Sequence, residues 1–94
     1  MLLSVVVPAY NEEKFLPLLL KSLQQQTYKG DYEVVVCDNN STDSTAEVAK
    51  SYGARVVPEP IPGYAHAFNR AFFSAKGDII ARAENLEGDM VFET

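Results

Sequence analysis

The stretch from Tyr32 to Lys50 reads "YEVVVCDNNSTDSTAEVAK", and it decides the fold class because an apolar run passes through a polar loop into a helix. The β-branched residues before Cys37 predict a buried strand. The spacing of Ser44 and Glu47 predicts a helix that begins near Ser44 with a capping box. Oxygen-bearing side chains fill every position between strand and helix, which is more than a helix start requires, so some of them are candidates for binding.

The same alternation of strands and helices continues outward in both directions. Further strands are predicted at Leu3–Val7, Ala54–Val57 and Asp78–Arg82, and further helices from Phe15 or Leu16 to about Gln26 and from Tyr64 to Ala75. The strands are apolar throughout, which is typical of strands covered on both faces. The order βαβαβαβ therefore predicts an α/β domain with a parallel sheet and right-handed crossovers.

Composition limits the class of protein. The chain has 94 residues, 47% of them hydrophobic, and a net charge of −5, which fits one small domain spanning 1–94 and argues against nucleic-acid binding. No apolar run reaches the roughly 18 residues of a membrane span. Because Cys37 is the single cysteine and the start carries no basic leader, we expect a cytoplasmic protein, with a membrane-peripheral position left open.

Three polar segments follow strand ends, where parallel α/β sheets bind their ligands. They are Pro8–Glu13, Asp38–Asp43 and Arg82–Asp89. Asp38 stands at a strand tip, where a carboxylate can accept hydrogen bonds from ribose hydroxyls or from a base N–H. The alternative is that Asp38–Asp43 form an Asx-rich turn, and the spacing leaves both interpretations open. The segment "PAYNEE" lacks the glycines of a dinucleotide site, which argues against binding of NAD or FAD.

Three blocks carry a resemblance to a known family. "VVVPAYNEEKFLPLLLKSLQQQTY", "YEVVVCDNNSTDSTAEVAKSYGARVV" and "GYAHAFNRAFFSAKGDII" resemble the N-terminal, nucleotide-sugar-binding half of a family 2 glycosyltransferase with the GT-A fold. The resemblance covers about residues 3–82, and residues 83–94 diverge. It implies a three-layer αβα, Rossmann-like parallel sheet with strand order 3-2-1-4.

The resemblance also implies the site residues. The matching positions that line the nucleotide and diphosphate are Pro8, Ala9, Tyr10, Glu12, Asp38, Asn40 and Asn69. Pro8 to Glu12 match the loop around the nucleoside base, Asp38 matches the acid at the base or ribose, and Asn69 matches a block near the diphosphate. The family often has an arginine where this chain has Phe68, so one phosphate contact is missing from the pattern.

The family's metal motif, Asp-x-Asp, is only partly matched. In "AENLEGD", Glu84 falls at the first acid and Leu86 at the second. Glu84 is therefore the candidate ligand for the Mg²⁺ or Mn²⁺ that the family uses; a solvated acidic loop is the alternative. No catalytic base can be matched, because the family places it in a second half. On this reasoning the chain resembles a truncated product or a fragment that is catalytically incomplete alone.

The resemblance implies transfer of a sugar from a nucleotide-diphosphate donor, expected to be a UDP-sugar, to a hydroxyl acceptor. A non-catalytic nucleotide-binding module and an assembly module are the alternatives. The predicted fourth strand, Asp78–Arg82, would be an edge that recruits partners. We therefore expect a homodimer, or a larger assembly, whose interface buries Asp78–Arg82 and Asp89–Thr94. The segment "MVFET" would cover this edge, either in its own chain or across a partner.

Overall fold

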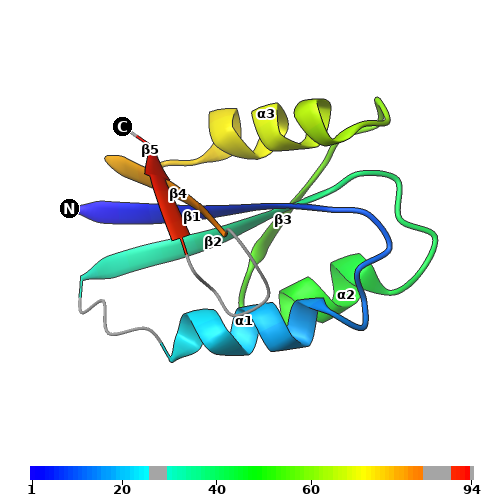
Figure 1. Cartoon of the computed structure of the whole chain (residues 1–94), viewed down its shortest axis with the longest axis horizontal. Helices are drawn as coiled ribbons and strands as arrows, with labels where there is room; N and C mark the ends of the chain where they lie inside the picture. The colour runs from blue at the N-terminus through cyan, green and yellow to red at the C-terminus, as the bar shows by residue number, and fades with distance from the viewer. Residues whose placement is uncertain (26–29, 84–89, 94) are drawn as a thin grey trace.

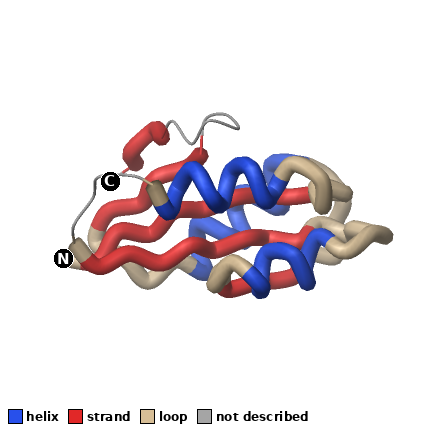
Figure 2. Tube along the Cα trace, turned by 90° about the horizontal axis from the view of Figure 1, so that it is seen from below, coloured by secondary structure: helices blue, strands red, loops and turns tan. Residues whose placement is uncertain are grey.

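The computed structural model describes residues 1–25, 30–83 and 90–93. Its elements are β1 (Leu2–Ala9), α1 (Leu16–Gln24), β2 (Asp31–Asp38), α2 (Thr45–Ser51), β3 (Arg55–Pro58), α3 (Tyr64–Ser74), β4 (Ile79–Ala83) and β5 (Met90–Glu93). They form three layers, with α1 and α2 below the sheet and α3 above it (Figure 1). The strands lie side by side along the length of the molecule (Figure 2). The predicted αβα architecture is confirmed.

The sheet has the order β3-β2-β1-β4-β5. β1 pairs in parallel with β2 on one side and with β4 on the other, and β2 pairs in parallel with β3. This confirms the predicted order 3-2-1-4. β5 then pairs antiparallel with β4, with Ala83 opposite Met90. The segment at Met90–Glu93 therefore covers the fourth strand within its own chain, so β4 is not an edge strand.

Both faces of β1 are buried, which explains its unbroken apolar sequence. On one face the buried cluster combines side chains of β1 with the apolar stripe of α1: Leu3, Val5, Val7, Leu16, Leu19, Leu20 and Leu23. On the other face Val6, Val35 and Cys37 pack against Ala67 and Ala71 of α3. Burial raises the pKa of the Cys37 thiol to about 11, so this thiol stays protonated and acts as a packed apolar group.

The start of α2 differs from the prediction. Ser44 is the N-cap residue, but its side chain makes no capping hydrogen bond, so the capping box expected between Ser44 and Glu47 does not form. Instead the N–H of Thr45 donates to Oδ1 of Asp43 at 2.9 Å. The helix begins where the spacing predicted, but the carboxylate one residue earlier receives the free N–H.

Candidate functional site

The β1–α1 loop and the β2–α2 loop are tied together by hydrogen bonds. Three consecutive backbone N–H groups of the first loop donate to side chains of the second: Asn11 to Ser41 Oγ at 2.9 Å, Glu12 to Thr45 Oγ1 at 2.8 Å and Glu13 to Asp43 Oδ2 at 3.3 Å. The second loop donates back, from Thr42 N–H to Asn11 Oδ1 at 2.8 Å and from Ser44 N–H to Glu13 Oε2 at 3.2 Å. The side-chain oxygens of Ser41, Asp43 and Thr45 thus hold the two segments to each other.

Asp43 lies at the centre of this loop clasp, which we define as residues 11–13 and 41–45. Burial acts to raise the pKa of the Asp43 carboxyl, but hydrogen bonds from the Thr45 hydroxyl, the Thr45 N–H and the Glu13 N–H outweigh it and lower the pKa. The carboxylate is therefore charged at neutral pH and accepts hydrogen bonds within the clasp. Asp43 therefore bonds both to the start of α2 and to the β1–α1 loop.

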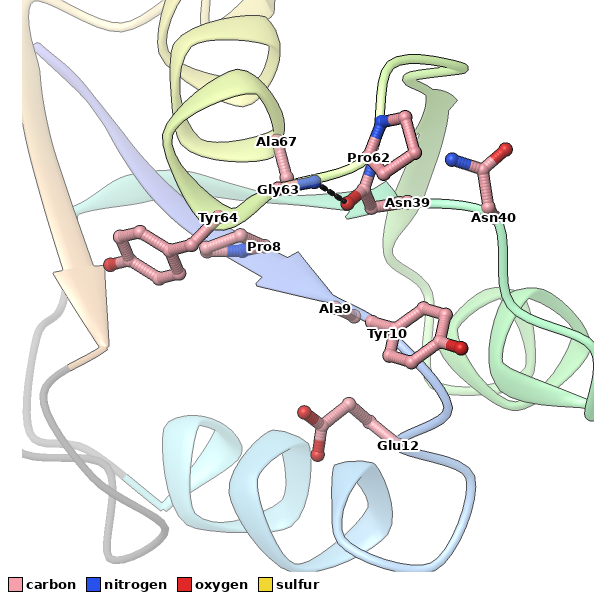
Figure 3. Close-up of a pocket in the computed structure, with 10 residues that line it drawn as sticks. All are labelled: Pro8, Ala9, Tyr10, Glu12, Asn39, Asn40, Pro62, Gly63, Tyr64 and Ala67. Carbon is pink, nitrogen blue, oxygen red and sulfur yellow. Dashed lines mark hydrogen bonds between the residues drawn. The ribbon is translucent and has the colours of Figure 1, made fainter.

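A pocket of about 410 Å³ opens beside the clasp, at the carboxyl ends of β1 and β2 and the start of α3 (Figure 3). Its lining residues are Pro8, Ala9, Tyr10, Glu12, Asn39, Asn40, Pro62, Gly63, Tyr64 and Ala67. This is the edge of the sheet at which parallel α/β proteins bind ligands. The volume lies within the range of small-molecule sites.

The pocket brings together five of the seven residues predicted for the nucleotide site: Pro8, Ala9, Tyr10, Glu12 and Asn40. Asp38 is not among its lining residues. Oδ1 of Asp38 accepts the N–H of Ser41, three positions further on, at 3.1 Å. Asn69 is exposed on α3 and does not line the pocket either. The predicted metal ligand, Glu84, lies outside the described residues.

The pocket offers both flat rings and a carboxylate. The side chains of Tyr10 and Tyr64 are 57% and 64% exposed, and they flank the open space into which the Glu12 carboxylate points (Figure 3). Rings at such a mouth can stack on a planar base, and a carboxylate can accept hydrogen bonds from ribose hydroxyls or from N–H groups. α3 begins at the pocket wall, and the start of a helix favours anions.

Sequence reasoning missed Asn39, whose side chain forms part of the pocket floor. Asn39 is 5% exposed, and its amide bonds to the segment 59–63, which lies twenty or more positions along the chain. The closely spaced prolines of "PEPIPG" were the signal that could have pointed to such a residue. A segment with so few backbone N–H groups leaves carbonyl oxygens that need donors from another part of the chain. Asn40 beside it has φ 66, a left-handed conformation that asparagine tolerates.

A buried acid supports the same wall. Glu59 is 7% exposed, its Oε2 accepts the N–H of Ile61 at 3.0 Å, and its Oε1 lies 3.5 Å from Nε of Arg70. The Ile61 hydrogen bond lowers the pKa of the Glu59 carboxyl; burial opposes this shift and the Arg70 charge adds to it. Glu59 therefore remains a carboxylate that fixes the segment in front of α3.

Metal ligands do not gather in the part of the chain that the structure describes. Within residues 1–25, 30–83 and 90–93, no three His, Cys, Asp or Glu side chains lie together so that they could hold an ion. Glu12 is the acid that the described residues bring to the pocket, and a single carboxylate does not make a cage for Mg²⁺ or Mn²⁺. We therefore derive no chemical step through a metal.

Sequence comparison decides the family. The family described as "Glycosyl transferase family 2" matches residues 4–84. The chain belongs to glycosyltransferase family 2. This family 2 chain is 44% identical over 78 residues to an uncharacterized glycosyltransferase of Mycobacterium tuberculosis, a match that covers 83% of the chain and 34% of that protein. The chain thus spans about a third of the length of this relative.

Solved structures of glycosyltransferases with the GT-A fold share the architecture. TarS of S. aureus is 34% identical, with a TM-score of 0.79 over 87% of this chain and 26% of TarS, and it has also been solved with UDP. A mannosyltransferase from Pyrobaculum calidifontis, solved with GDP-Man and Mn²⁺, is 34% identical, with a TM-score of 0.76 over 84% of this chain and 26% of that protein. Among the described residues of the family 2 chain, no helix is long and apolar enough to cross a membrane.

Proposed function

We propose that the pocket binds the nucleotide of a nucleotide-diphosphate sugar, with UDP as the nucleotide, and that the whole protein transfers the sugar to a hydroxyl acceptor. The observation that carries this proposal is the pocket itself, where Tyr10, Glu12 and Asn40 meet at the carboxyl ends of β1 and β2. The UDP complex of TarS supports the choice of nucleotide. A module that binds the nucleotide without turnover is the alternative.

In this proposal the base lies between the two loops. The exposed ring of Tyr10 stacks on the base, while the Glu12 carboxylate and Oδ1 of Asn40 are available for polar contacts. Nδ2 of Asn40 is already engaged, because it donates to the carbonyl oxygens of Pro60 at 3.0 Å and Glu59 at 3.4 Å. Asp38 keeps its proposed role at the base or ribose through Oδ2, because Oδ1 is bonded to Ser41. Pro8 and Ala9 supply the wall formed by the end of β1.

The diphosphate would then point toward the start of α3. The helix start supplies a favourable field for an anion, and Asn69 is proposed to stand near the phosphates. Phe68 supplies no charge at the position where the family often has arginine, so we expect weak binding. A divalent metal, Mg²⁺ or Mn²⁺, remains part of the proposal with Glu84 as its ligand, and the Mn²⁺ of the mannosyltransferase structure supports it.

We propose the cytoplasm as the compartment, on the ground of the unpaired, buried Cys37.

Titration with UDP, followed by NMR of the backbone amides, tests the binding proposal. We expect shifts at residues 8–12 and 38–40, and an affinity that falls about tenfold or more in Tyr10→Ala, since aromatic stacking on a base contributes about 1–3 kcal/mol. Tyr32→Ala is the matched control, because Tyr32 is 44% exposed and lies at the far end of β2. The proposal is wrong if millimolar UDP leaves residues 8–12 and 38–40 unshifted.

Turnover separates the enzyme from the binding module. Release of UDP from UDP-glucose and other UDP-sugars, with and without Mn²⁺, would be measured for this chain and for the longest natural form that contains it. Transfer by the longer form, together with nucleotide binding by this chain, is the result we expect. Binding without turnover in both forms would favour the non-catalytic module.

A further inference from the structure

The segment that precedes α3 and forms one wall of the pocket has few hydrogen-bond donors of its own. Residues 58–63 read "PEPIPG", and Pro58, Pro60 and Pro62 have no backbone N–H. The segment therefore has carbonyl groups in excess of donors. Such a segment keeps one conformation only if side chains from another part of the chain bond to those carbonyls.

Asn39 supplies those bonds from the end of β2. Its side-chain Nδ2 donates to the carbonyl oxygens of Glu59 and Ile61, both at 2.8 Å. Its Oδ1 accepts the N–H of Gly63 at 2.9 Å, and its backbone N–H donates to the carbonyl of Ala9 at 2.8 Å. Asn39 thus ties the segment before α3 to the end of β1. Asn40 adds to this attachment, since its Nδ2 donates to the carbonyl oxygens of Pro60 at 3.0 Å and Glu59 at 3.4 Å.

The hydrogen bonds of Asn39 reach residues that line the pocket. Gly63, which Asn39 holds, is the N-cap of α3 and has φ 126, a conformation that suits glycine. Pro62 and Tyr64 flank Gly63 and line the pocket. Both N–H groups of the Asn39 amide are engaged with the wall, so the amide acts through the wall and not as a donor to a ligand.

We propose that Asn39 is a positioning residue for the nucleotide site: its amide sets the distance between Ala9 and the Pro62–Tyr64 wall, and so sets the affinity for the nucleotide. This inference rests on the proposed function. Amide chemistry is essential at this position because an aspartate carboxylate would face the carbonyl oxygens of Glu59 and Ile61 with no proton to donate. Below its own pKa, which burial would raise, the aspartic acid could donate one hydrogen bond again.

The variants Asn39→Asp and Asn39→Ala test this role, with Gln24→Glu as the matched control. Nε2 of Gln24 also donates to a backbone carbonyl, that of Tyr52 at 3.4 Å, and its substitution adds the same charge away from the pocket. Circular dichroism checks that each variant is folded. Hydrogen exchange of the Gly63 amide is measured without ligand, and UDP affinity is measured by NMR at neutral and at mildly acidic pH.

We expect the Gly63 amide to exchange about tenfold or more faster in Asn39→Asp and Asn39→Ala, while the amides of Val5 and Val35 keep their protection. UDP affinity should fall about tenfold or more in both variants at neutral pH. At mildly acidic pH, the loss of UDP affinity relative to the native chain should become smaller for Asn39→Asp but not for Asn39→Ala. Taking the ratio of the two affinities at each pH removes the effects of the charged and ionisable groups that both chains share around this wall, which include Asp38, Glu59, His66 and Arg70.

Two results would overturn the inference. Native exchange at Gly63 in folded Asn39→Asp and Asn39→Ala would show that Asn39 does not hold the wall. Faster exchange with UDP affinity within about twofold of native would show that the wall position does not set affinity. If the native chain itself binds no UDP, the proposed function fails and the inference about affinity fails with it, whereas the exchange measurement still decides whether Asn39 holds the wall.

Discussion

The backbone N–H of Glu12 donates to Oγ1 of Thr45 at 2.8 Å, and the two residues are 33 positions apart in the chain. Glu12 lines the pocket, whereas Thr45 is fully buried as the first residue of α2. The backbone of the loop that carries this candidate ligand-binding residue is therefore anchored by a hydroxyl at the start of α2.

Thr45→Val should weaken both the fold and the site. Valine keeps the shape but removes the acceptor for Glu12 N–H and the donor to Asp43, and an unsatisfied buried polar group costs about 1–3 kcal/mol. Urea denaturation should show that loss in the free energy of unfolding, and UDP should bind more weakly. Thr42→Val is the control, since Thr42 is exposed and should change stability by less than about 0.5 kcal/mol. Equal effects of the two substitutions would argue against a structural role for the buried hydroxyl.

Glu33→Gln should change how stability depends on pH. Burial acts to raise the pKa of the Glu33 carboxyl, but hydrogen bonds from Ser4, the Lys76 N–H and Arg55 lower it below the ordinary value of 4.5. A carboxyl with a lowered folded-state pKa contributes stability above its unfolded-state pKa, and that stability is lost as the pH falls through the folded-state pKa. At neutral pH the native chain should therefore have a larger free energy of unfolding than the variant. This difference in stability should shrink at pH values well below 4.5.

Urea denaturation at several pH values measures that difference. Asp31→Asn is the control, because Asp31 is an exposed acid at the start of the same strand. A gap between native chain and Glu33→Gln that stays constant from neutral pH to strong acid would contradict the prediction.

Gly77→Ala should destabilise the chain through contact with β1. A Cβ at Gly77 would lie 2.6 Å from Oγ of Ser4 and 2.8 Å from the backbone carbonyl oxygen of Leu2. Overpacking of this kind costs about 1–3 kcal/mol. Adding Ser4→Ala should recover only part of the loss, because the Leu2 carbonyl remains in place. Thermal unfolding of the single and double variants measures the loss, and a Gly77→Ala chain as stable as the native one would refute it.

Removal of Met90–Thr94 should promote self-association. β5 pairs with β4 along Ile80 to Ala83, so its loss leaves a row of unpaired N–H and C=O groups on a β-prone strand. Light scattering at several concentrations should show larger species for the shortened chain than for the full chain. The homodimer expected from the sequence stays a prediction, and the same measurement on the full chain tests it. A shortened chain that associates no more than the full chain would count against the role of β5.

The parallel sheet was predictable because each of its strands carries its own signal. β1 and β2 are continuous apolar runs, and helical periodicity separates them, so the order of elements follows from local pattern. Met90–Glu93 was expected to cover the fourth strand, as it does. Whether it would do so in its own chain or across a partner was left open, since a short β-prone segment carries no information about which copy it pairs with.

The details of the site were less predictable because they depend on distant partners. The spacing of Ser44 and Glu47 indicated a capping box, but Glu13 bonds to the Ser44 N–H and Asp43 to the Thr45 N–H. Asn39 looked like one more polar loop residue, and its role becomes visible only when residues 59–63 are placed beside it. At Asp38, the spacing could not show that Oδ1 accepts the N–H of Ser41, because that bond depends on the backbone conformation of the loop.

The loop clasp has a consequence for exchanging loops between this chain and its relatives. Residues 11–13 donate to side chains of residues 41–45 and accept from their backbone. A graft of one loop alone would leave several N–H groups of the other without acceptors. The two segments should therefore transplant only as a pair, so that a chimaera carrying both from one parent folds while each single-loop chimaera does not.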